Sequence, residues 1–152
     1  MNGSAKMWNE QQSLDSGGWN LSDMRAWLNT GFNSECLYTS LPTGLKESIK
    51  SVKIISDNGV YDKSLTTTYD KIFLASAEEL NVFSSNYTIK GQGTPYALFT
   101  DDASRKVEGK MYWTRSTGCN FALHTFCTID ANGRLAGNGA GNKNSTMIYF
   151  CI

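Results

Sequence analysis

His124 is the only histidine of the chain and the first residue to consider for chemistry. A Ser-His-Asp hydrolase would set it between a serine such as Ser116 and an acid such as Asp130. The three residues are close in sequence, but no glycine-flanked nucleophile elbow surrounds the serine. We therefore expect no catalytic residue and interpret the chain as a protein other than an enzyme.

Cysteines and carboxylates offer metal or thiol chemistry, and their spacing argues against it. The four cysteines are residues 36, 119, 127 and 151, and no two stand at the two-residue spacing of a zinc or redox motif. A single histidine excludes a site of several imidazoles, and Asp130 is the only carboxylate after Tyr112, too few for a calcium site there. We expect free thiols, no metal and no cofactor.

The last forty residues instead have the pattern of a binding surface. Two bulky blocks, 112–116 and 146–152, flank the segment 121–129, which is typical of a strand, and the small, polar run 134–145. That run cannot bury enough apolar area to fold alone, so we expect a surface loop held by the flanking strands. The candidate ligand-binding residues are Asn120, Ala122, His124, Thr128, Ala136, Asn138, Asn142, Lys143 and Asn144.

Composition restricts the class of partner. Lys plus Arg equals Asp plus Glu at 14 each, so no net field attracts nucleic acid or an anionic membrane. No apolar run reaches the roughly 18 residues that span a bilayer. At 152 residues and 40% hydrophobic, the chain can form one domain with a core.

The elements that must position this surface are short. Ser22 is typical of an N-cap before a helix that ends at Gly31, and a second helix is expected after Pro42. Residues 52–55 and 71–75 favour strands, and Ser76 with Glu79 forms a capping-box pattern. The order of elements predicts an α+β fold.

We divide the chain accordingly. Residues 1–16 are expected to be a flexible leader or arm, and residues 17–152 a single domain with 112–152 as its ligand-binding region. The residues expected to hold the structural frame are Trp19, Arg25, Trp27, Trp113 and Arg115. The tryptophans lie in apolar patterns that are more typical of a core than of a ligand platform.

An ordered set of motifs resembles an uncharacterised domain family common in gut bacteria and their phages. The set covers nearly the whole chain. It comprises Gly17-Gly18-Trp19, Ser22, Met24-Arg25, Trp27-Leu28-Asn29, Leu41-Pro42, Leu45-Lys46, Ile49-Lys50, Thr68, Asp70 to Leu74, Ser76, Glu79, Tyr112 to Ser116 and Phe150-Cys151-Ile152. Two departures stand out: Ser145 to Phe150 replaces the family's Gly-Val-Arg-Pro-Ala-Phe, and Thr117 stands where proline is common.

The resemblance implies a C-type-lectin-like fold, related in shape to formylglycine-generating enzymes. Members of this type include the variable proteins of diversity-generating retroelements, in which a reverse transcriptase rewrites adenine-containing codons of a C-terminal ligand-binding region. The tripeptides with which C-type lectins bind calcium and sugar are absent, and Cys119 lacks the second cysteine that the enzyme chemistry needs.

The sequence therefore predicts a binding module that recognises a protein or glycan on a host or cell surface, as part of a phage virion or of a longer surface protein. Asparagine has adenine-rich codons, which suits the polar run as a target of diversification. Two alternatives stay open: a structural virion decoration domain, and a calcium-independent carbohydrate-binding domain.

Overall fold

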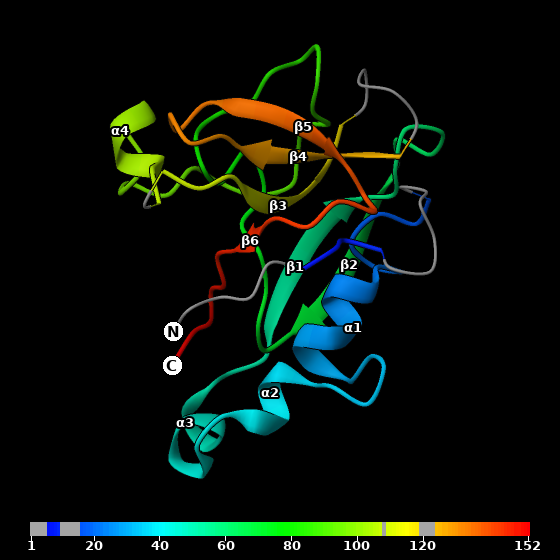
Figure 1. Ribbon diagram of the computed structural model, residues 1–152, viewed down its shortest axis with the longest axis vertical. Helices are drawn as coiled ribbons and strands as arrows, with labels where there is room; N and C mark the ends of the chain where they lie inside the picture. The colour runs from blue at the N-terminus through cyan, green and yellow to red at the C-terminus, as the bar shows by residue number, and fades with distance from the viewer. Residues whose placement is uncertain (1–5, 10–15, 108, 119–123) are drawn as a thin grey trace.

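The computed structural model describes residues 6–9, 16–107, 109–118 and 124–152. Within them the chain has an α+β fold with two separate sheets (Figure 1). The α+β prediction is therefore confirmed.

The larger sheet has the strand order β5-β4-β3-β6. Its strands are β3 Tyr112–Thr117, β4 Thr125–Ile129, β5 Leu135–Gly139 and β6 Ser145–Thr146. β4 runs antiparallel to β3 and to β5, whereas β6 is parallel to β3. The register between β3 and β4 shifts between Trp113 and Thr117, and such an irregularity bends a strand and re-aims its side chains.

The smaller sheet pairs β1 Val52–Asp57 with β2 Leu65–Asp70 in antiparallel register. The predicted strand at 52–55 is confirmed, and β2, which contains the three consecutive threonines 66–68, is its partner. Four short helices complete the described elements: α1 Asp23–Asn29, α2 Leu37–Ser40, α3 Thr43–Ser48 and α4 Asp102–Arg105. α1 follows the predicted cap, since the Ser22 side chain accepts a hydrogen bond from the Arg25 amide at 3.0 Å.

Three sequence-based expectations about regular structure are wrong. Residues 71–75 form no strand, although 72–75 are buried, and Phe73 makes only an isolated bridge to Tyr149. The run 134–145 is not one loop, because β5 occupies its first half and pairs with β4 along five residues. The terminal block adds only the two-residue β6 to the large sheet, and beyond it Tyr149 and Cys151 make single bridges to Phe73 and Lys50.

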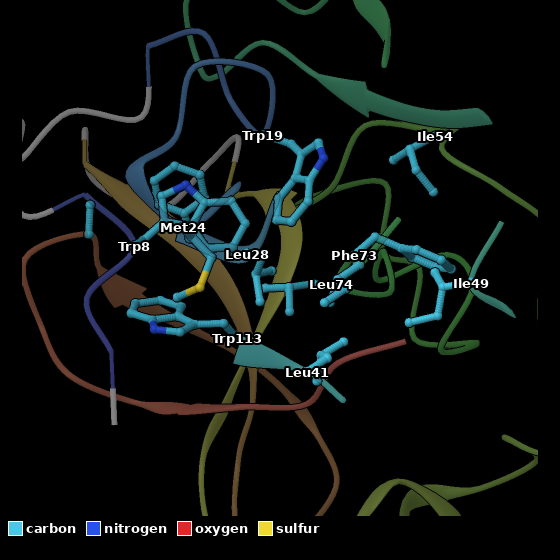
Figure 2. Packing of buried hydrophobic residues seen from close by; sticks show 13 residues of the cluster. Trp8, Trp19, Met24, Leu28, Leu41, Ile49, Ile54, Phe73, Leu74 and Trp113 are labelled. Carbon is cyan, nitrogen blue, oxygen red and sulfur yellow. The ribbon is translucent and has the colours of Figure 1, made fainter. Parts of the chain in front are cut away.

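An aromatic cluster forms the centre of the main core (Figure 2). Trp8 is fully buried, with its ring centroid 5.7 Å from that of Trp19, 6.0 Å from Trp113 and 4.2 Å from Phe126. Trp19 and Trp113 are core residues as predicted, while Trp27 is only partly buried against the cluster. A second cluster of buried residues packs where Tyr112 of β3 pairs with Ile129 of β4; its other members are Ala75, Leu80 and Phe99.

Residues 6–9 form a packed arm that belongs to this core. The Lys6 amide donates to the Asn144 carbonyl at 2.9 Å, the Trp8 amide to Ala140 at 3.0 Å, and the Met24 amide to the Trp8 carbonyl at 3.0 Å. The arm therefore joins α1 to the connection after β5. Residues 1–16 were expected to be a flexible leader or arm; residues 6–9 are a packed arm, and residues 1–5 and 10–15 lie outside the described residues.

Candidate functional site

Arg115 is the hub of the domain. It is 1% exposed, and its guanidinium is paired bidentately with the Glu79 carboxylate, with Nη2 2.8 Å from Oε1. The same group donates to the carbonyls of Ile55 at 3.1 Å, Leu74 at 2.8 Å and Gln92. Planar guanidinium groups suit such multiple contacts. One side chain thus fixes three segments that are far apart in sequence.

The bend in β3 explains how Arg115 reaches this position. Its amide donates to the Ala75 carbonyl at 3.0 Å, outside the ladder between β3 and β4. Glu79 is held by the capping box that the sequence predicts: the Ser76 amide donates to Oε2, and the Glu79 amide to Ser76 Oγ, both at 3.0 Å. Arg115 was expected to hold the structural frame, and here it binds main-chain carbonyls of three segments. Its ion pair with Glu79 was not predicted.

A second buried carboxylate, Asp70, ties α1 to the small sheet. Trp19 Nε1 and Arg25 Nε each donate to it at 2.8 Å, and Thr68 Oγ1 donates at 2.7 Å. Asn29 extends the connection by accepting hydrogen bonds from the amides of residues 71 and 72 at 3.0 Å. Trp19 and Arg25, both expected to hold the frame, thus meet at one buried carboxylate.

Asp57 connects the end of β1 to the end of β3. Its carboxylate accepts hydrogen bonds from the Thr117 amide and hydroxyl and from the Gly59 amide. Burial raises the pKa of the Asp57 carboxyl, and the hydrogen bonds from Thr117 act against that shift. Gly18 lies against the same point, where an added Cβ would be 1.9 Å from the Asp57 carbonyl oxygen. Only glycine fits there, because its φ is +48° as well.

These contacts gather several connections at one end of the molecule, which we call the loop end. It comprises the turn 17–21, the connection 58–64, the start of β4 at His124 and the turn 140–144 (Figure 1). The Gly17 amide donates to the Asn58 carbonyl at 2.9 Å, and the Ala140 amide to the His124 carbonyl at 2.7 Å. A rigid frame that presents connections in this way is the arrangement that binding sites use.

The candidate ligand-binding residues divide into three groups. Asn120 and Ala122 lie outside the described residues. Thr128 and Asn144 are buried, so the expectation that they are exposed is wrong. For Thr128 the reason is that β4 is covered on both faces, which the alternation of residues along a strand does not reveal. His124, Ala136 and Asn138 are half-buried, and Asn142 and Lys143 are exposed.

The asparagines are coupled to the fold. Asn142 Nδ2 donates to Asn138 Oδ1 at 2.6 Å, and Asn138 Nδ2 donates to Asn144 Oδ1 at 3.1 Å. The Asn144 carbonyl in turn accepts the amide of Lys6. Asn138 and Asn144 therefore shape the turn that receives the N-terminal arm. Of the candidates that the structure describes, only Asn142 and Lys143 are fully exposed.

The trio considered for hydrolysis has other structural contacts. Ser116 Oγ is buried, accepts the Ala77 amide at 3.0 Å and donates to Gln92 Oε1 at 3.1 Å. Asp130 Oδ1 accepts the amides of Asn132 and Arg134 in the turn between β4 and β5. His124 has a φ of +84°. Among the described residues no group of three or more His, Cys, Asp or Glu side chains could hold a metal ion.

Sequence reasoning missed Trp8, Asp57 and Gln92, which are all buried. A tryptophan inside a polar stretch was the one available signal for Trp8, since so large an apolar side chain is rarely left in water. Nothing local marks Asp57 or Gln92, because their partners lie far away in sequence.

Comparison with known proteins returns one match. The model of a family described as a domain of unknown function, DUF6273, matches residues 4–147. No curated protein and no solved structure matches the chain. The helices in the described part of the chain are all too short to cross a bilayer.

Proposed function

The chain belongs to the DUF6273 family of domains of unknown function, and from the geometry of this member we propose that it is a ligand-binding module and not an enzyme. The observation that carries the proposal is the Arg115 hub. Its buried ion pair and three carbonyl contacts hold β1, residues 74–79 and residue 92 together. Asp57 and the main-chain bonds of Gly17 and Ala140 then fix the connections of the loop end, where Asn142 and Lys143 are exposed. Preorganised connections lower the entropy lost on binding a partner.

The proposal includes a C-type-lectin-like fold and a role as the variable protein of a diversity-generating retroelement. Support comes from the ordered motifs along nearly the whole chain and from the structural roles of Trp19, Arg25 and Arg115 within them. Diversified positions would be the exposed ones near Asn142, Lys143 and His124. Asn138 and Asn144 would stay constant because they form the turn under the arm.

Neighbouring DNA tests the diversification part. We expect a near-copy of the codons for residues 112–152 that differs mainly at adenines, close to a reverse-transcriptase gene. Differences spread evenly over all bases, or concentrated at the codons for Asn138 and Asn144, would contradict it.

Binding is tested with a double variant, Asn142→Ser with Lys143→Ser. Both side chains are exposed, so folding stability should change by no more than about 0.5 kcal/mol. Pull-down from an extract of host cell surfaces should lose the partner that the unmodified domain captures. The matched control is Glu47→Ser with Lys50→Ser, two exposed residues in and after α3, which lies at the opposite end of the molecule (Figure 1). Equal capture by both double variants would show that the partner does not contact this surface.

A further inference from the structure

A shallow hollow of about 320 Å³ lies at the loop end, away from Asn142 and Lys143. One wall is the turn 17–21, which contributes Asn20 and Leu21. The other wall is the connection between β1 and β2, which contributes Asn58, Tyr61, Asp62 and Thr66. The volume is at the lower end of the range for small-molecule sites, about 300–1,000 Å³.

Both walls of the hollow are fixed in place. The Asn58 amide group is held on each side: Thr66 Oγ1 donates to Oδ1 at 2.7 Å, and Nδ2 donates to Ser64 Oγ at 2.9 Å. The Ser64 amide donates to Asp62 Oδ1 at 3.0 Å. The turn is attached through the bond from Gly17 to the Asn58 carbonyl and the close approach of Gly18 to Asp57. The polar groups are therefore oriented before any ligand arrives.

Two apolar side chains stand beside this polar floor without a role in the core. Tyr61 is 80% exposed and Leu21 is 70% exposed. An exposed aromatic face next to fixed amide and hydroxyl groups can cover the apolar face of a ligand while its polar edge is hydrogen-bonded. The hollow thus offers contacts to both faces of a small amphipathic ring.

The charge of the lining selects the ligand class. Among the described residues no lysine, arginine or histidine lines the hollow, and Asp62 is the charged side chain that does. The hydrogen bonds from Ser64 lower the pKa of the Asp62 carboxyl, so it is an ionised acceptor at neutral pH. An anionic ligand would meet a negative charge and no cation. A hydroxyl-rich neutral ligand can donate to Asp62 and can both donate to and accept from side-chain amides.

We propose that the hollow between the turn 17–21 and the connection 58–66 binds a neutral carbohydrate, with Tyr61 covering one face of a sugar ring. The inference rests on the proposed binding function and names a ligand class for its loop end. It places the carbohydrate site in the N-terminal half of the chain, separate from the proposed C-terminal surface at Asn142 and Lys143.

The test uses the full chain labelled with ¹⁵N and three neutral probes: maltotriose, cellotriose and triacetylchitotriose. At millimolar concentration at least one probe should shift the backbone amide signals of Gly17, Asn58 and Ser64. Trigalacturonate is the anionic probe. Nα-acetyl-lysine N-methylamide, which keeps its charged side-chain amine, is the cationic probe. Neither should shift these signals.

Matched variants separate the hollow from its surroundings. Tyr61→Ala should weaken carbohydrate binding at least about tenfold, because it removes the central apolar contact. Tyr69→Ala removes a tyrosine of similar exposure, 68%, on β2 outside the hollow and should leave the affinity unchanged.

Three results would overturn the inference. The inference fails if no neutral probe shifts the amide signals of the hollow, if the two tyrosine variants bind the probe equally well, or if only the lysine derivative binds. If the domain still captures its partner through Asn142 and Lys143 in any of these cases, the carbohydrate inference fails and the proposed function stands. If neither surface binds anything, both fail.

Discussion

Replacing Arg115 with methionine tests the frame on which the proposed function depends. Methionine keeps much of the side-chain volume but removes the guanidinium. The variant leaves the Glu79 carboxylate buried without its cation and leaves the carbonyls of Leu74 and Gln92 without this donor. Breaking one partner of a buried ion pair costs about 3–5 kcal/mol. The expected loss therefore lies in that range, a large fraction of the roughly 5–15 kcal/mol that stabilises a domain.

Urea unfolding followed by tryptophan fluorescence measures this loss, since Trp8, Trp19 and Trp113 are buried in the core. The matched control is Arg134→Met. Arg134 also pairs with a carboxylate, Asp102, but its side chain is 70% exposed and the ion pair is 3.3 Å long. An exposed pair contributes about 0–1 kcal/mol, so the control should unfold almost as the unmodified protein does.

A second substitution separates the buried charge from lost packing. Glu79→Gln in the Arg115→Met background removes the unpaired carboxylate, so the double variant should be more stable than Arg115→Met alone. A loss below about 1 kcal/mol for Arg115→Met would refute the assignment of Arg115 as the hub. A double variant less stable than the single one would refute the role of the unpaired charge.

Three further predictions concern the core, the thiols and the buried acid. Trp113→Ala should destabilise the domain by about 3–5 kcal/mol, because the side chain is 1% exposed and packs against Trp8 and Phe126; a melting temperature unchanged within error would contradict this. All four thiols are predicted to be free; those of Cys36 and Cys151 are free in the structure, while residue 119 lies outside the described part. Alkylation under denaturing, non-reducing conditions should therefore modify four cysteines by mass, and two would contradict the prediction. The raised pKa of Asp57 means that its contribution to stability is fully present below the unfolded-state pKa and is lost as pH rises through the folded-state pKa. Urea unfolding should be measured between the unfolded-state and the folded-state pKa of Asp57. There the free energy of unfolding of the unmodified protein should fall as pH rises, and that of Asp57→Asn should not. Identical pH profiles would show that burial does not set this pKa.

Local sequence patterns determined the elements whose signals are short-range. The Ser22 cap, the reciprocal bonds of Ser76 and Glu79 and the turn at 130–133 each need only residues within four positions of one another. Alternating or bulky apolar blocks likewise predicted β1 and β3. These interactions form wherever the backbone allows them, so the sequence alone is informative about them.

Tertiary structure decided the rest because the decisive partners are distant. The run 134–145 has little propensity for a strand, but its first half forms β5 by pairing with β4. Residues 71–75 have the apolar pattern of a strand. They form none because only Phe73 makes a bridge, to Tyr149, and residues 72–75 are buried in the core without a strand partner.

The candidate site shows the same division. The sequence identified Asn142 and Lys143 as exposed polar residues, and the structure agrees. It could not show that Asn144 lies under the N-terminal arm, or that Trp8 of that arm fills the core, because hydrogen bonds and packing between residues over a hundred positions apart leave no local pattern. Nor could it show that a turn after Gly17 and a connection after Asp57 face each other across a hollow, because that juxtaposition exists only once the frame around Arg115 has formed.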